Sequence, residues 1–383
     1  MNNTIYLSFI GELQRNIDSN KGLIQVVLGP RQVGKTTTVL KLIEDRYSKR
    51  ALYVSTDDVF NPNASWLREQ WSEAQSGGKI LFIDEIQKLQ NWSQSIKALF
   101  DESRRQKKIT QCVLLGSSSL EIQKGLTESL TGRFQLIRAH HWNFAESKLG
   151  YGLTLEEYLK FGGYPGSYQF IKTDSLIDYI KNSIVSTVID KDILLYQTVK
   201  NLALFRQAFE ILISYPAQEI SFTKLLGQLQ DKGNVEIIKY YISLYEGAFL
   251  IKALEKFASK ATLKKASSPK ILPLAPCLPY LQIRGDYSAA ERGRIFESIV
   301  GAQLLRTSEE LYYWREGKNE VDFILRIGKL LYAIEVKSGS KKNVGGLERF
   351  KEQYPAAKRA VIQVSDYPEF EQDPISFLEQ KSI

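Results

Sequence analysis

The chain has 383 residues, of which 43% are hydrophobic and 25% charged, and this length and composition predict an ordinary soluble globular protein of two or three domains. No apolar run approaches the roughly 20 residues that span a bilayer, no secretion signal begins the chain, and two cysteines are too few for a disulfide framework or a zinc site, so we expect a cytoplasmic protein. The formal net charge of +8 at pH 7 permits a polyanionic partner without requiring one.

The first element with a chemical signature is a glycine-rich loop at residues 29–36, between an apolar run (LIQVVL) and a stretch with helical spacing. This order of strand, loop and helix is the context in which G-x-x-x-x-G-K-[ST] predicts a phosphate-binding loop. Its glycines allow backbone N–H groups to converge on phosphate oxygens, Lys35 reaches the β and γ phosphates, and Thr36 offers its hydroxyl to Mg²⁺. We therefore predict ATP and Mg²⁺ as ligands. The expected nucleotide-binding residues are Gly29, Pro30, Arg31, Gln32, Val33, Gly34, Lys35, Thr36 and Thr37.

Short apolar runs alternate with helical stretches up to about residue 146. Such alternation predicts an α/β domain with a parallel sheet and helices on both faces, and ligands in that architecture lie at the carboxyl ends of the strands. We assign this domain to residues 1–148. The predicted strands are residues 23–28, 51–54, 80–83, 112–115 and 135–137.

An apolar strand ends in Asp84 and Glu85, some fifty residues after the phosphate-binding loop. We expect Asp84 to hold Mg²⁺ and Glu85 to polarise the attacking water, with helix capping by the two acids as the alternative. The next strand ends in Ser117, Ser118 and Ser119, of which one could contact the γ phosphate or the water. The alternative there is a serine-rich turn that caps a helix.

An arginine, Arg133, stands shortly before the last predicted strand of the domain. It could neutralise transition-state charge on a neighbouring subunit's nucleotide, or it could form a surface salt bridge.

The motifs GPRQVGKTT, FIDEIQKL, LLGSSSLE and ESLTGRF resemble the AAA+ ATPases of bacteria and archaea that carry an uncharacterised C-terminal domain. FGGYPG, LLGQLQDKGN and ASSPK extend the resemblance over nearly the whole chain. The resemblance implies the nucleotide, hydrolysis, sensor and arginine-finger roles given above, and a homo-oligomer, expected to be a ring. The chain departs from better-known AAA+ enzymes because no arginine near residues 162–166 can serve as a second sensor.

Residues 149–200 read as a helical lid, with helices broken at residues 162–166. Residues 201–287 contain three helical segments (205–215, 222–229 and 235–245) and two strand candidates (249–251 and 271–272), an order that predicts a winged helix. Basic residues crowd the predicted hairpin, which suggests contacts with the phosphates of duplex or branched DNA, a solvated loop being the alternative. They are Lys256, Lys260, Lys264, Lys265 and Lys270.

Residues 288–383 predict a compact α/β domain. Its Asp322 and its Glu335-Val336-Lys337 resemble the D…E-x-K core of the restriction-endonuclease-like fold, with Glu297 on the preceding helix between Gly293 and Gly301. In that reading Asp322 and Glu335 share a divalent ion and Lys337 supports the reacting charge. Strand acids paired with basic neighbours are the alternative, and the fold alone does not establish cleavage.

Two functions compete. The first is an ATP-driven machine that binds, remodels or translocates DNA, with nuclease activity left open. The second is a nucleotide-controlled assembly switch whose nuclease-like domain is inactive. The sequence leaves open the oligomer number, the preferred DNA structure and polarity, and the biological pathway.

Overall fold

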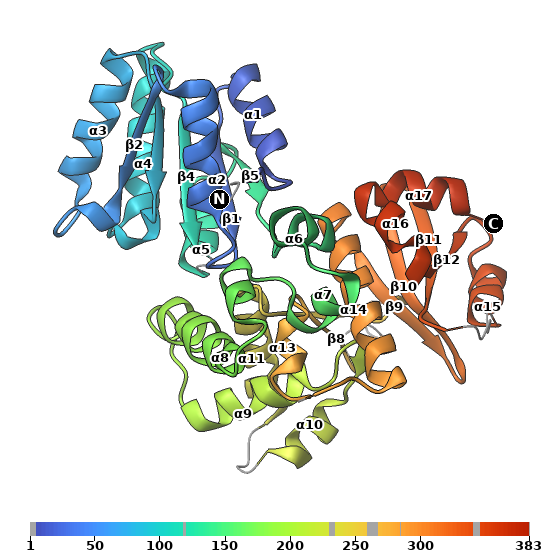
Figure 1. Ribbon diagram of the computed structural model, residues 1–383. Coiled ribbons are helices and arrows are strands. Elements are labelled where there is room, and N and C mark those ends of the chain that lie inside the picture. Colours follow the sequence, from blue (N-terminus) through green and yellow to red (C-terminus); the bar gives the residue numbers. More distant parts are fainter. Residues whose placement is uncertain are drawn as a thin grey trace. The chain divides into compact units, whose positions relative to one another are not determined.

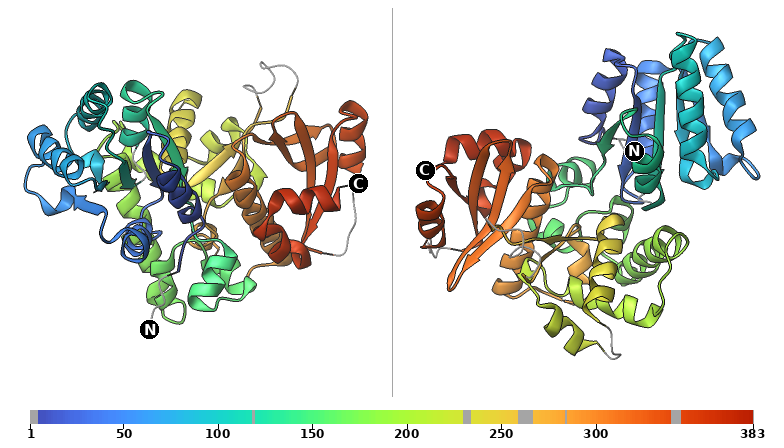
Figure 2. Two further views of the ribbon diagram at one scale, coloured as in Figure 1. Left: turned by 90° about the horizontal axis from the view of Figure 1, so that it is seen from above. Right: turned by 180° about the vertical axis from the view of Figure 1, so that it is seen from behind.

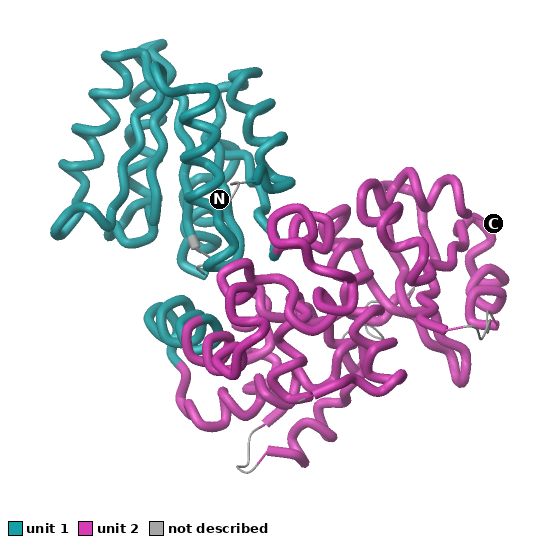
Figure 3. Tube along the Cα trace, viewed as in Figure 1, with its two compact units in different colours: residues 1–141, 184–198 teal, residues 142–183, 199–383 magenta. Residues whose placement is uncertain are grey.

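A computed structural model of the chain describes residues 5–117, 120–229, 234–258, 267–283, 285–339 and 345–382 (Figures 1 and 2). The chain forms two compact units: unit 1 contains residues 1–141 and 184–198, and unit 2 contains residues 142–183 and 199–383 (Figure 3). Within the described ranges, no helix is both long enough and apolar enough to cross a membrane. The division into four domains remains a prediction.

Unit 1 is built on a five-stranded parallel sheet in the order β2-β3-β4-β1-β5, which confirms the predicted parallel sheet (Figure 1). Its strands are β1 (Ile24–Gly29), β2 (Ala51–Ser55), β3 (Ile80–Asp84), β4 (Cys112–Ser117) and β5 (Phe134–Arg138). Every residue of β1 and β3 is buried, as expected of parallel strands with both faces covered.

Unit 1 also contains helical elements, most of them between the strands, and η6 from later in the chain. They are α1 (Ile10–Ser19), α2 (Lys35–Leu42), η1 (Ile43–Tyr47), η2 (Thr56–Asp58), α3 (Ala64–Ser76), η3 (Ile86–Lys88), α4 (Trp92–Arg105), α5 (Leu120–Ser129) and η6 (Val188–Ile193). Within the sheet, Gly29 ends β1 and Asp84 ends β3, so the predicted nucleotide and metal residues lie at one edge. Gly29 also fits only as glycine, because a Cβ there would stand 2.2 Å from the carbonyl oxygen of Ala139.

Unit 2 begins with short helices: α6 (Phe144–Tyr151), α7 (Leu155–Phe161), η4 (Pro165–Phe170), α8 (Ser175–Asp178) and η5 (Tyr179–Val185), the last of which ends in unit 1. Capping boxes at Asn143 and Thr154 start the first two. Gly163 has a φ of 110°, which interrupts the helices where the sequence predicted a break.

The next part of unit 2 contains three helices and a three-stranded antiparallel sheet in the order β6-β8-β7. The elements are α9 (Leu202–Ile213), β6 (Gln218–Glu219), α10 (Phe222–Gln228), α11 (Val235–Gly247), β7 (Ile251–Leu254), β8 (Lys270–Pro273) and α13 (Cys277–Tyr280). The side chains of Ser221 and Asn234 cap α10 and α11, and each accepts a hydrogen bond from the backbone N–H three residues later. The first hairpin strand begins at Ile251 rather than at residue 249, because Phe249 has a φ of 58° and belongs to a turn.

The C-terminal part of unit 2 has a four-stranded sheet in the order β12-β11-β10-β9, in which only the β11–β12 pair is parallel. Its elements are α14 (Ala289–Thr307), β9 (Leu311–Glu316), β10 (Asn319–Ile327), β11 (Leu330–Lys337), α15 (Gly345–Gln353), β12 (Lys358–Gln363), η7 (Val364–Asp366), α16 (Tyr367–Gln372) and α17 (Pro374–Lys381). Phe257, which follows β7, packs into the core of this sheet beside Trp314 and Phe350, and its N–H donates to the carbonyl of Tyr313 at 2.7 Å. The start of the hairpin loop is therefore attached to the C-terminal sheet.

Candidate functional site

The loop after β1 has the backbone shape of an anion cradle. Gly34 has a φ of 86° and Gln32 a φ of 60°, both left-handed, and α2 starts directly after Gly34. The ammonium of Lys35 donates to the carbonyls of Gly29 at 3.0 Å and Pro30 at 2.7 Å. Burial lowers the pKa of Lys35 to about 8, and the charges of Glu85 and Asp84 only partly oppose this.

Asp84 joins this loop to β3. Its Oδ2 accepts hydrogen bonds from the hydroxyl of Thr36 at 2.6 Å and from the hydroxyl of Tyr53 at 2.9 Å. Thr36 and Asp84 are 48 positions apart in sequence, and the structure brings them together as expected of residues at the carboxyl edge of one sheet. Tyr53 was not among the sequence candidates. Burial and the charge of Asp84 raise its pKa, so Tyr53 acts as a neutral hydroxyl donor.

Glu85 adopts a backbone conformation that is uncommon for a side-chain-bearing residue, with a φ of 51°. Its N–H donates to Asp84 Oδ1 at 2.8 Å, its carbonyl accepts from the hydroxyl of Thr56 at 2.8 Å, and its carboxylate accepts from the amide of Gln87. Glu85 precedes η3 but its side chain caps no backbone N–H there. The structure therefore provides no support for the capping alternative at Glu85.

The side chain of Arg31 points to a segment that sequence reasoning did not associate with the loop. Residues 184–198 belong to unit 1, and there Asp192 of η6 is buried, with 1% of its side chain exposed. Arg31 Nε lies 3.1 and 3.0 Å from the two carboxylate oxygens of Asp192, and Nη2 lies 2.5 Å from Oδ1. Burial by itself lowers the pKa of Arg31, but the hydrogen bonds and charge of Asp192 raise it above its ordinary value. We call residues 184–198 the strap.

Replacing Asp192 with alanine should lower the free energy of unfolding by about 2 kcal/mol, because it leaves the mostly buried Arg31 guanidinium without its carboxylate partner. Breaking a fully buried ion pair costs about 3–5 kcal/mol, and we expect a smaller loss here because part of the Arg31 side chain is exposed. Urea unfolding monitored by circular dichroism measures the difference. Glu102→Ala is the matched control, because the Arg68–Glu102 pair is exposed and should contribute below about 0.5 kcal/mol. Equal losses in the two variants would contradict a structural role for the Arg31–Asp192 pair.

The remaining candidates of unit 1 are less completely defined. Ser117 ends β4, but its side chain, together with Ser118 and Ser119, lies outside the described residues. Arg133 forms a bidentate ion pair with Asp101 on α4, with Nε–Oδ1 at 2.8 Å and Nη2–Oδ2 at 3.0 Å. Its carbonyl accepts from the N–H of Ile24, the first residue of β1, so Arg133 lies at the opposite end of the sheet from Gly29.

The acids predicted in the C-terminal part come together in unit 2. Asp322 on β10 accepts from the N–H of Val336 on β11 at 2.8 Å through Oδ2, and Lys337 Nζ donates to Glu335 at 2.6 Å. Glu297 on α14 completes the group, and burial together with the charge of Asp322 raises its pKa. α14 approaches its neighbours closely at Gly301, where a Cβ would stand 2.7 Å from Leu272 and 2.8 Å from Phe323.

The carboxylate cluster, which we define as Glu297, Asp322, Glu335 and Lys337, also receives Lys270 from β8. The prediction that Lys270 contacts DNA is wrong, because the residue is only 1% exposed and its ammonium pairs with Glu297. All four residues of β8 are buried, so the Lys270 side chain is enclosed by the protein. Lys256 is half-buried, and its backbone forms an isolated parallel β-bridge with Tyr313. Lys260, Lys264 and Lys265 lie outside the described residues.

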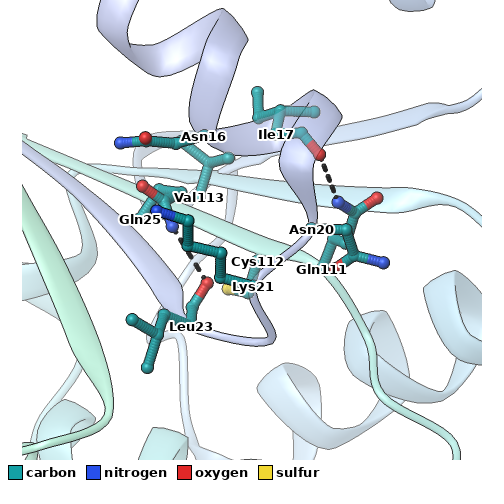
Figure 4. Close-up of a pocket in the computed structure, with 9 residues that line it drawn as sticks. All are labelled: Asn16, Ile17, Asn20, Lys21, Leu23, Gln25, Gln111, Cys112 and Val113. Atoms are coloured by element: carbon teal, nitrogen blue, oxygen red, sulfur yellow. Dashed lines mark hydrogen bonds between the residues drawn. The ribbon is translucent and has the colours of Figure 1, made fainter.

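A small polar cavity lies between α1, β1 and β4 (Figure 4). Its volume of about 10 Å³ suits one water molecule. Gln25 Oε1 and Asn16 Nδ2 have no hydrogen-bond partner among the described residues, and a water could satisfy both. Its strand residues belong to the amino ends of β1 and β4, so this cavity is separate from the loop that follows β1.

Comparisons with known proteins divide the chain into three matched regions. Residues 21–148 match the family described as AAA domain, and residues 152–274 and 292–379 match two domains of unknown function, DUF8612 and DUF4143. The uncharacterized protein MJ1544 of Methanocaldococcus jannaschii is 27% identical over 329 residues, which cover 79% of this chain and 72% of that protein.

Two solved structures are similar over part of the chain. The Walker-type ATPase paby2304 of Pyrococcus abyssi is 13% identical with a TM-score of 0.45, covering 71% of this chain and 94% of that one. AMPPCP-bound DnaA from Aquifex aeolicus is 16% identical with a TM-score of 0.32, covering 62% of this chain and 87% of that one.

Proposed function

We propose that this protein, whose residues 21–148 form an AAA domain of the P-loop ATPase type, hydrolyses ATP and couples that reaction to DNA. The observation that carries the proposal is the hydrogen bond of 2.6 Å between the Thr36 hydroxyl and Asp84, at the point where Glu85 follows. It supports a single site that combines a phosphate loop, a metal-binding pair and a catalytic acid.

Each residue of this site has a separate task. Lys35 exchanges the carbonyls of Gly29 and Pro30 for phosphate oxygens when the triphosphate enters the loop. Glu85 accepts a hydrogen bond from the attacking water and orients it toward the γ phosphate, and Gln87 holds the carboxylate that does so. The left-handed backbone at Glu85 fixes the direction of that side chain from the end of β3.

The oxygen donors of Thr36 and Asp84 fit a magnesium ion, which prefers hydroxyl, carboxylate and phosphate oxygens. When bound, the ion neutralises charge on the β and γ phosphates. Tyr53 keeps one oxygen of Asp84 in place through its own hydrogen bond of 2.9 Å.

Affinity for ATP should depend on pH through Lys35. Its pKa of about 8 in the free protein means that the ammonium prevails below pH 8 and the neutral amine above it. Only the ammonium attracts phosphate, so we expect affinity to fall as pH rises from 8 to 9, by up to about tenfold per unit. Fluorescence titration with a non-hydrolysable ATP analogue at pH 7, 8 and 9 measures this. Lys35→Arg, which stays charged, should show a flat profile; a flat profile in the unaltered protein would refute the role of this pKa.

The DNA part of the proposal rests on residues 201–287 and on charge. The order α9, β6, α10, α11, β7, β8 is that of a winged helix, and the chain carries a net charge of +8. With Lys270 excluded by its burial, the proposed phosphate contacts are Lys256, Lys260, Lys264 and Lys265. We place these contacts on one lysine-rich loop between β7 and β8.

The coupling is tested by ATP turnover with and without duplex, branched and single-stranded DNA at low salt. We expect at least one form of DNA to stimulate turnover, and the stimulation to weaken as salt rises, because phosphate contacts release counterions. The triple variant Lys260→Ala, Lys264→Ala, Lys265→Ala should lose the stimulation and keep the basal rate. Turnover that is equal with and without every form of DNA would refute the coupling.

We further propose a homo-oligomer, expected to be a ring, in which Arg133 acts on a neighbouring subunit's nucleotide. Its own loop is out of reach: the six-residue strand β1 separates the two ends of the sheet by roughly 20 Å, at about 3.3 Å per residue. In that oligomer Arg133 would leave Asp101 for the γ phosphate.

The second candidate function is a nucleotide-controlled switch with an inactive nuclease-like domain. The observation that favours it is the ion pair between Lys270 and Glu297 inside the carboxylate cluster. The two functions share the ATP site and differ in whether DNA alters turnover.

A further inference from the structure

We infer that Lys270 is a built-in cation of the carboxylate cluster, and that its ammonium takes the place a divalent metal would need. The inference goes beyond ATP hydrolysis and concerns only unit 2. It excludes metal-dependent cleavage by this cluster and assigns Glu297 and Asp322 a different task, the attachment of β8 to α14 and β10.

The contacts of Lys270 account for its whole ammonium group. Nζ pairs with Glu297, donates to the carbonyl of Asp322 at 3.2 Å, and lies 3.7 Å from Asp322 Oδ1 and 3.9 Å from Glu320. It also lies 5.1 Å from the centre of the Phe323 ring. These five contacts come from α14 and β10, so the ammonium lies between the helix and the sheet.

Most of the oxygens that a metal would require already have a partner. Asp322 Oδ2 accepts the N–H of Val336, its Oδ1 faces Lys270, and Glu335 Oε1 accepts from Lys337 at 2.6 Å. Glu335 Oε2 is buried and has no hydrogen-bond partner among the described residues, so a cation there would have to share the cluster with the Lys270 ammonium. Across the described part of the chain, no three histidine, cysteine, aspartate or glutamate side chains are arranged to hold a metal ion. The donor set therefore does not fit a divalent cation while Lys270 is present.

The lysine cannot easily withdraw from this position. β8 is the middle strand of its sheet, and Lys270 pairs there with Glu219 on one side and Leu254 on the other. A divalent cation beside Glu297 would stand within a few ångströms of the ammonium, and two positive charges so close together repel strongly in a buried site. Removing the ammonium is therefore what would free the acids for a metal.

Titration of Mn²⁺ into the full-length protein without nucleotide, followed by electron paramagnetic resonance, tests this directly. The proteins compared are the unaltered chain, Lys270→Met, which keeps an apolar stem, Lys270→Ala, and Asp322→Asn in the presence and absence of Lys270→Met. Circular dichroism and thermal unfolding establish which variants are folded. Because the comparison depends on Asp322, Mn²⁺ at the Thr36–Asp84 pair adds equally to every sample.

We expect the unaltered chain and Asp322→Asn to bind Mn²⁺ alike. A folded Lys270 variant should gain one site, at least about tenfold tighter, that Asp322→Asn removes, and Mn²⁺ should raise its melting temperature. A site in the unaltered chain that Asp322→Asn abolishes would overturn the inference. So would a folded Lys270→Met protein that gains no site, since the ammonium would then not be what excludes the metal. Neither result bears on ATP turnover, which separates this inference from the proposed function.

Discussion

Exchange of Glu85 for glutamine should lower kcat for ATP hydrolysis by about 10²–10⁴-fold and leave the affinity for ATP within about threefold. The amide keeps the size and the hydrogen bond to Gln87 but is a far weaker proton acceptor for the attacking water. Phosphate binding is left intact because the loop and Lys35 are unchanged. Steady-state turnover and equilibrium binding of ATP, measured on the same preparation, check both halves of the prediction.

The matched control is Glu69→Gln, an exposed carboxylate on α3 whose loss removes the same charge from unit 1. It should leave kcat unchanged. A Glu85→Gln protein that hydrolyses ATP within about threefold of the unaltered rate would remove Glu85 from the mechanism and leave Asp84 as the only acid at the end of β3.

The sheet of unit 1 and its phosphate-binding loop could be predicted from the sequence for physical reasons. Buried parallel strands are continuous apolar runs, and glycines at both ends of a loop have few other uses, so all five strands and the loop were predicted within one or two residues. The hydrogen bond between Thr36 and Asp84 follows too, because strands of one parallel sheet end at one edge.

Sequence patterns gave less information where a contact joins elements of different kinds. Asp192 is 161 positions from Arg31 and lies in a helical stretch with no motif, so only the fold reveals the strap. A lysine within a basic stretch of sequence is normally predicted to be exposed. The one local feature that distinguishes Lys270 from Lys265 is that Lys270 begins the apolar run of β8. Such a lysine is buried when acidic side chains from other elements surround it. A local sequence pattern contains no information about those distant acids.

The second substitution with a large expected effect on ATP turnover is at Arg133. Arg133→Ala should reduce ATP turnover by about 10³-fold or more if its guanidinium completes the neighbouring site, because an arginine finger contributes about 10³–10⁵ to kcat. The same loss could follow from a damaged fold, since the substitution also breaks the ion pair with Asp101. Asp101→Ala breaks that pair and keeps the arginine, so turnover in this variant should be preserved.

A mixture of two inactive variants tests directly whether Arg133 acts on the nucleotide of a neighbouring subunit. Lys35→Ala protein has no functional loop but an intact Arg133, and Arg133→Ala protein has the reverse. When the two are mixed and allowed to exchange subunits, contacts between an intact loop and an intact arginine form, and turnover should recover to a fraction set by the mixing ratio. Activity should peak near equal amounts, as the number of such contacts does. If the mixture stays as inactive as its parts although the subunits exchange, Arg133 supports turnover only through its ion pair with Asp101, and the proposed role on a neighbouring subunit is refuted.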